Sequence, residues 1–142
     1  MANLQRFLDG QRLDYDVALE EMRAGEKRSH WIWYVFPQMK GLGHSPNAQF
    51  YGIVDLEEAR AYLAHPVLGA RLREITQEVL RHADRDIFSI MGWEIDARKF
   101  KSSMTLFDAV SPDDIFAQAL DVFFAGRRDR RTLAALSDRS SD

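Results

Sequence analysis

Apolar side chains recur at helical spacing along much of the chain, and capping residues mark where the stretches begin and end. Near the N-terminus, Leu13, Val17 and Met22 recur among acidic residues, and Gly25 then offers a stop. This pattern predicts a helix over about residues 13–24.

Two stretches in the middle of the chain each define one apolar face. Asp55, with Glu58 three positions later, resembles a capping box at the start of the first stretch, and Pro66 then reopens a helix. The apolar positions after Pro66 are spaced by four, three and four residues, and they are Leu68, Leu72, Ile75 and Val79. A similar spacing predicts a core helix over about residues 93–108, with Trp93, Ala97, Phe100, Met104 and Phe107 on its apolar face.

Two serine–proline pairs indicate further helix starts. Ser45 precedes Pro46, and Ser111 precedes Pro112 in the same way. Serine is a favoured N-cap and proline is tolerated at the first helical position, so each pair is typical of a helix N-terminus. The second pair predicts a helix over about residues 112–124.

The run from Trp31 to Phe36 is apolar at every position, so its periodicity does not distinguish a buried strand from a buried helical segment. Its short length slightly favours a strand. Pro37 ends the run in either case, because proline lacks an amide hydrogen and restricts the residue before it.

Composition indicates one globular domain covering residues 1–142. Hydrophobic residues make up 46% of the chain and charged residues 29%, and no internal repeat or linker interrupts it. Most of the predicted elements are helices. The fold class that we expect is therefore all-α, as a single compact multi-helix domain with short loops.

Charge and residue usage exclude several classes of function. The formal net charge is −3, which disfavours nucleic-acid binding, and we interpret the basic cluster at 127–131 as a solvated turn. The chain has no cysteine, and His44, His65 and His82 lack metal-ligand spacing, so we predict no metal and no cofactor. Because no signal peptide and no apolar span of about 20 residues is present, we expect a cytoplasmic protein without membrane contact.

One candidate for chemistry is His30, which lies between the basic pair at 27–28 and two tryptophans. A titratable imidazole beside Trp31 and Trp33 offers a base next to a platform on which a planar ligand could stack. Gln38, just after the run, could orient such a ligand. The structural alternative is that the tryptophans belong to the core and His30 bonds a backbone carbonyl.

A second candidate is a polar ridge on the helix predicted at 93–108. Asp96, Lys99 and Ser103 are spaced by three and four residues, and Ser102 lies close to Lys99. A lysine with two hydroxyls could bind a phosphate or a carboxylate. The alternative is an exposed ion pair with two helix-tolerated serines.

The loop before Ser45 is a third candidate. Gly41 and Gly43 lead into the predicted helix start, where free amides attract anions without charged side chains. An ordinary flexible connection explains the two glycines better, because they match neither a dinucleotide fingerprint nor a phosphate-binding loop.

Several of these motifs, taken in order, resemble a known family. They are the stretch 27–38 with Gly41, Gly43 and Ser45, the stretch 61–72 around His65 and Pro66, and the stretch 99–107. Over about residues 3–136 the chain resembles the bacterial family known as domain of unknown function 1810, leaving a short polar C-terminal tail. The resemblance implies an all-helical domain, which favours a helix for the aromatic run, and it supplies no activity. The label "calpastatin-like" often given to such proteins does not suit this aromatic-rich chain, because calpastatin is disordered.

Our leading hypothesis is a pocket for a small planar anionic ligand such as a nucleotide, formed by the three candidate segments. In an enzyme, His30 would be the general base, and Lys99 with Arg28 would stabilise developing negative charge. The alternative is a protein–protein interaction module without catalytic activity, anchored by its aromatic and basic residues. A third hypothesis, nucleic-acid binding through residues 127–131, requires a strongly salt-dependent complex. The sequence does not set the oligomeric state.

Overall fold

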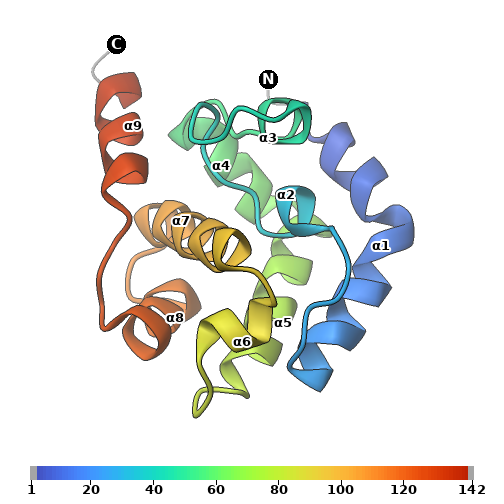
Figure 1. Ribbon diagram of the computed structural model, residues 1–142. Helices are drawn as coiled ribbons and strands as arrows, with labels where there is room; N and C mark the ends of the chain where they lie inside the picture. The colour runs from blue at the N-terminus through green and yellow to red at the C-terminus, as the bar shows by residue number, and fades with distance from the viewer. Residues whose placement is uncertain (1–2, 141–142) are drawn as a thin grey trace.

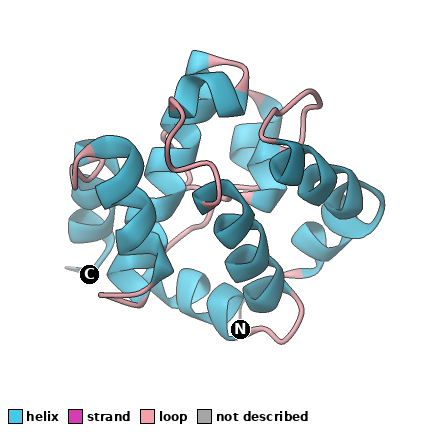
Figure 2. Ribbon diagram, turned by 90° about the horizontal axis from the view of Figure 1, so that it is seen from below, coloured by secondary structure: helices cyan, strands magenta, loops and turns pink. Residues whose placement is uncertain are grey.

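The computed structural model describes residues 3–140, with side chains described through residue 137. Nine helices lie within this range, and the described residues form no strand; one isolated parallel bridge joins Met39 and Ile53, which lie between helices. The helices are α1 Gln5–Ala24, α2 Ile32–Val35, α3 Pro46–Phe50, α4 Leu56–Ala64, α5 Leu68–Leu80, α6 Ile87–Met91, α7 Glu94–Val110, α8 Ile115–Phe124 and α9 Arg130–Ser140. Short loops join them (Figure 2), and the expected all-α class is confirmed.

Helix α7 organises the packing. It contacts α8 and α9 on one side and α2 on the other, while α4 and α6 also pack against it (Figure 1). Phe100, Met104 and Phe107 of α7 are fully buried, as the spacing in the sequence predicts. Trp93 differs from that prediction, because it is the N-cap residue of α7 and is 38% exposed.

The first helix begins eight residues earlier than predicted. Its buried side includes Phe7 and Gln11, whereas Leu13 is 79% exposed and Val17 is 44% exposed. Gln11 interrupts the apolar pattern of the sequence because it is a polar core residue. Its amide Nε2 donates to the carbonyl oxygen of Tyr34 at 2.6 Å. Satisfied in this way, a polar side chain can occupy a buried position.

Most of the predicted helix starts are confirmed by their caps. The Ser45 hydroxyl accepts a hydrogen bond from the amide of Ala48 at 3.1 Å, and the Asp55 carboxylate accepts one from Glu58 at 2.8 Å. At the start of α5, the His65 ring accepts from the amides at positions 67 and 68.

The start predicted at residue 112 is wrong by three residues. Helix α8 begins at Ile115 and is capped by Asp114, whose carboxylate accepts from the Ile115 amide at 2.7 Å. Ser111 donates to the same carboxylate instead of capping the helix. Asp113 takes a φ of 58°, a left-handed turn that keeps the chain from being helical before Ile115.

The aromatic run forms the single helical turn of α2, so the weak preference for a strand is wrong. The basic cluster is only partly a turn, because Arg130 and Arg131 already belong to α9. Asp129 caps that helix by accepting from the amide and the hydroxyl of Thr132. Most of the predicted polar tail is the end of α9, and residues 141–142 lie outside the described range. No helix in that range is long and apolar enough to cross a membrane.

Candidate functional site

Helix α2 lies against α7 and presents one aromatic ring to it. Trp33 is only partly buried, whereas Trp31 is 1% exposed and Tyr34 is 8% exposed. The Lys99 ammonium lies 4.8 Å from the centre of the Trp33 ring, a cation–π distance. Ser103 lies one helical turn beyond Lys99 and is fully buried. The structure therefore brings Lys99 against Trp33, and helical spacing places Ser103 on the same side of α7 as Lys99.

These three side chains share an unmet capacity to donate hydrogen bonds. Trp33 Nε1 and Ser103 Oγ are buried and have no hydrogen-bond partner. Within the described residues, the Lys99 ammonium contacts only the Trp33 ring. A buried donor without an acceptor lowers the stability of the fold by about 1–3 kcal/mol. Two such donors near an unpaired cation therefore require an explanation, such as a ligand that binds there.

The environment also weakens the proton affinity of Lys99. Burial lowers the pKa of its amine, because the charged form loses hydration. The nearby charge of Lys27 lowers this pKa further, while Asp96 acts in the opposite direction. The ammonium is thus held without full hydration and without an anionic partner in contact, which favours binding of an external anion.

Gln38 connects Trp33 to the loop that precedes α3. The two side chains line a crevice of about 10 Å³ together with Ala48 and three neighbouring residues, room for about one water molecule. Gln38 is 8% exposed. A Cβ added to Gly43 would lie 3.6 Å from Gln38 Nε2 and 2.8 Å from Ala48 Cβ, so Gly43 packs closely against this wall of the crevice.

A buried ion pair lies beside this cluster. The Lys27 side chain is fully enclosed and its ammonium is 2.7 Å from the carboxylate of Asp96. It lies 4.8 Å from the ring centre of Trp31 and 4.6 Å from that of Trp93. The ammonium also donates to the carbonyl oxygen of Ser29. Through these contacts the loop before α2, residues 25–31, packs against the first turn of α7.

This ion pair corrects the interpretation of the polar ridge. Asp96 was expected on an exposed face in a pair with Lys99, but it is 6% exposed and pairs with Lys27. Lys99 is thereby left without a carboxylate in contact. The core position of Lys27 was not predictable from the sequence, because an adjacent lysine and arginine after a helix is typical of a surface turn.

Glu21 of α1 holds the same loop from the other side. Its carboxylate accepts from Trp31 Nε1 at 2.9 Å, from the Ser29 hydroxyl at 2.6 Å and from the amide of Arg28 at 2.9 Å. Burial alone would raise the pKa of Glu21, but these hydrogen bonds to the charged form outweigh that effect and lower it. No local sequence signal marks Glu21, because its partners lie seven to ten residues further along the chain.

The other predicted site residues lie outside the group at Trp33. His30 is exposed, and its ring stacks on Trp93 with centres 4.9 Å apart. The Arg28 side chain is 72% exposed and pairs with Glu26 at 3.2 Å. Trp31 is enclosed and bonded to Glu21, which leaves no ring face for a ligand.

The remaining candidates occupy the loop and the neighbouring turn of α7. Gly41 is exposed with a φ of 98°, a conformation that favours glycine. The Ser45 hydroxyl is used as a helix cap. Ser102 is 7% exposed and adjoins Ser103. Within the part of the chain that the structure describes, no group of three or more His, Cys, Asp or Glu side chains could hold a metal ion.

Comparisons with known proteins give a family but no activity. The family model described as "Protein of unknown function (DUF1810)" matches residues 1–136. A comparison with curated proteins gives no match. Among solved structures, the chain is similar to the conserved hypothetical protein Rv1873 from Mycobacterium tuberculosis, with 47% identity and a TM-score of 0.91. That similarity covers 94% of this chain and 96% of the other.

Proposed function

The chain belongs to the DUF1810 family, whose description names no activity, and from that premise we propose that it binds a small anionic ligand beside Trp33. The observation that carries this proposal is the set of unpaired donors at Trp33 Nε1, Ser103 Oγ and Lys99 Nζ. A carboxylate or phosphate group accepts hydrogen bonds and carries negative charge, so it would satisfy all three.

The aromatic ring supports a planar ligand. Two tryptophans belong to this segment, Trp33 within α2 and Trp31 at its N-cap. Of these two, only Trp33 is partly exposed. A planar group can stack on an indole face while its anionic substituent meets Lys99. Gln38 lines a crevice together with Trp33 and offers an amide that can both donate and accept. A nucleotide or an aromatic acid fits this chemistry.

The size of the crevice limits how such a ligand binds. Space for about one water separates Trp33 from Gln38. We therefore place only the anionic group against the buried donors, with the planar part on the outer edge of Trp33. Because Ser103 is fully buried, its hydroxyl becomes accessible to the anion only if neighbouring side chains move.

A screen of thermal stability against carboxylic acids, phosphates and nucleotides tests the proposal, because a ligand that binds the folded state raises its melting temperature. The best ligand of the screen is then titrated by calorimetry against Lys99→Met and Ser103→Ala. We expect at least about a tenfold loss of affinity in each, since a hydrogen bond to a charged group contributes about 1.5–3 kcal/mol.

Two further variants separate binding from folding. Trp33→Phe keeps a ring and removes Nε1, so we expect weaker binding of the ligand. We expect no loss of stability, because the substitution removes a buried donor that has no acceptor. Ser102→Ala is the matched control for Ser103→Ala. If both serine variants bind equally well, or if no compound in the screen stabilises the protein, the proposal is wrong.

Catalysis by His30 stays a prediction. The imidazole stacks on Trp93, beside the ion pair that links this loop to α7. If the ligand is turned over, His30→Ala should abolish turnover while leaving binding intact. The alternative of a protein–protein interaction module loses support, because Trp31 and Tyr34, two aromatic residues of the run that would anchor a partner, are buried.

A further inference from the structure

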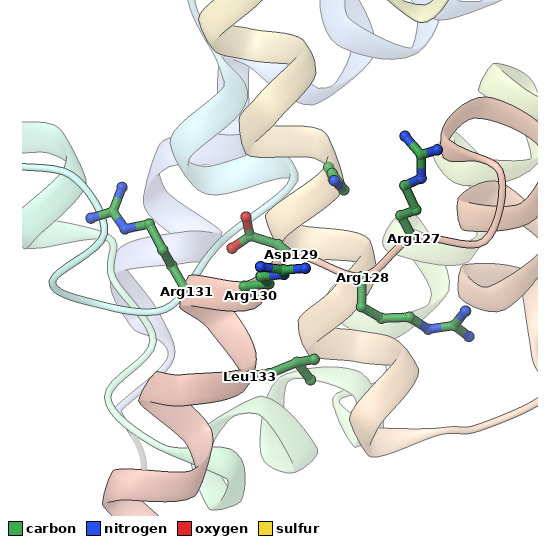
Figure 3. Close-up of a pocket in the computed structure, with 7 residues that line it drawn as sticks. Arg127, Arg128, Asp129, Arg130, Arg131 and Leu133 are labelled. Atoms are coloured by element: carbon green, nitrogen blue, oxygen red, sulfur yellow. The ribbon is translucent and has the colours of Figure 1, made fainter.

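A basic groove lies between α7 and the segment that joins α8 to α9. Its volume is about 640 Å³, within the range of small-molecule sites. The residues that line it, which we call the arginine groove, are Lys101, Arg127, Arg128, Asp129, Arg130, Arg131 and Leu133 (Figure 3). Five cationic side chains and one carboxylate thus surround one cavity in a chain whose formal net charge is −3.

Little of this positive charge is neutralised inside the protein. Arg128 contacts Asp108 at 3.2 Å, and this is the one ion pair of the arginine groove among the described residues. The Asp129 carboxylate caps α9 by accepting from the amide and the hydroxyl of Thr132, and among the described residues it makes no ion pair. Arg127 and Arg130 are exposed, and their side chains have no acceptor within the described structure.

The other side chains of the groove point in different directions (Figure 3). Arg131 reaches the loop before α3, where it donates to the carbonyl oxygen of Leu42 at 2.9 Å (Figure 3). Arg130 lies between Arg131 and Arg128 (Figure 3). The positive end of the 11-residue helix α9 adds to the potential, since the helix begins at Arg130. The summed positive potential of these groups attracts an anion to the groove.

We propose that the arginine groove binds a small polyphosphate, meaning a compound with two or more linked phosphate groups. Guanidinium groups match phosphate oxygens in bidentate geometry, and several linked phosphates are needed to reach cations spread around the cavity. An aromatic or apolar ligand fits less well, because Leu133 is the only apolar side chain of the lining. A nucleic acid would need a basic surface extending beyond one cavity, which the net charge of the chain disfavours.

This site is separate from the one proposed at Trp33. Lys99 and Lys101 are two positions apart on α7, so they point to different sides of the helix. Lys99 lies over Trp33 of α2, whereas the Lys101 ammonium lies 5.7 Å from the ring centre of Phe124 of α8. A change at Lys99 should therefore leave binding in the arginine groove intact.

The test is calorimetric titration of the protein with inorganic tripolyphosphate at 0.15 M salt. The key variant is Arg127→Gln with Arg130→Gln, because neither side chain makes a contact that folding needs. The matched control is Arg12→Gln with Arg60→Gln, which removes the same charge from two exposed arginines on α1 and α4. We expect at least a tenfold loss of tripolyphosphate affinity in the key variant and less than a twofold change in the control and in Lys99→Met.

Three results would overturn the proposal. The first is no binding of tripolyphosphate to the wild-type protein, and the second is an equal loss of affinity in the key and control variants, which indicates bulk charge alone. The third comes from competition with a single-stranded RNA 12-mer at equal phosphate concentration. If the RNA displaces tripolyphosphate, the groove belongs to a nucleic-acid surface, whereas retention of tripolyphosphate supports the small ligand.

Discussion

The buried ion pair between Lys27 and Asp96 should be a major determinant of stability. The Lys27 side chain is fully enclosed, and that of Asp96 is 8% exposed. Replacing Lys27 by methionine keeps a similar length but leaves the carboxylate uncompensated in the core. Removing one partner of a buried pair costs about 3–5 kcal/mol, against a total of about 5–15 kcal/mol for a domain of ordinary stability.

Urea unfolding followed by circular dichroism measures this cost. With a slope of about 2 kcal/mol per molar urea, a loss of about 4 kcal/mol lowers the midpoint by about 2 M. Circular dichroism is preferable to fluorescence, because Lys27 contacts the rings of Trp31 and Trp93 and its removal alters their emission. The matched control is Arg98→Met, which breaks an exposed pair with Glu94 on the same helix and should cost less than about 0.5 kcal/mol.

The double variant Lys27→Met with Asp96→Leu decides whether the charge is the cause. Because both charges are removed together, most of the lost stability should return, as replacement of a buried pair by apolar groups is often neutral. Two results would refute this reasoning. One is a loss of stability in the double variant equal to the sum of the losses in Lys27→Met and Asp96→Leu, and the other is a loss below about 1 kcal/mol for Lys27→Met alone. Loss of the Lys27 charge should also raise the pKa of Lys99, which can be followed by NMR titration of the lysine side chain.

Three smaller predictions test other parts of the fold by the same unfolding assay. Gly69→Ala should cost about 3 kcal/mol, because the added Cβ would lie 1.9 Å from the carbonyl oxygen of Leu63, and an undiminished midpoint would contradict this close approach. Gln11→Leu should cost about 1–3 kcal/mol, because the buried carbonyl of Tyr34 loses its 2.6 Å hydrogen bond and keeps only a longer one, at 3.5 Å, from the Tyr62 hydroxyl; a gain in stability would show that the hydrogen bond from Gln11 is dispensable. Glu21 has a lowered pKa in the folded protein, so its stabilisation is present above its ordinary pKa of 4.5 and is lost as the pH falls through the folded value. Glu21→Gln should therefore flatten the decline in stability below pH 4.5, and identical pH profiles would exclude this role.

The helices were predictable wherever local rules determine them. The apolar spacing of α5 and α7 and the caps at Ser45 and Asp55 depend on residues within one or two turns, and these predictions are confirmed. The start of α1 was not predictable in this way. Its buried stripe contains Gln11, which the core accepts only because Tyr34 and Tyr62 from distant segments bond its amide.

The site was predictable in part for the same reason. Lys99 and Ser103 stood out by helical spacing, and Trp33 by composition. What the sequence could not show is which of their polar atoms lack a partner, because that depends on every element packed around them. The role of Lys27 was hidden as well, since its partner Asp96 lies 69 positions further along the chain and only the tertiary fold brings them together.

The loop before α3 gives the two proposed sites a physical connection other than the core of α7. Arg131, in the arginine groove, donates to the carbonyl oxygen of Leu42, and the adjacent Gly43 packs against Gln38 and Ala48 in the wall of the Trp33 crevice. A polyphosphate that draws Arg131 away from Leu42 would release this loop, whereas the α7 residues between the sites, Phe100 and Met104, are close-packed and resist displacement. Any coupling between the sites should therefore act through the loop. By thermodynamic linkage it must be reciprocal: an anion bound at Trp33 changes the affinity for polyphosphate by the same factor by which bound polyphosphate changes the affinity for that anion.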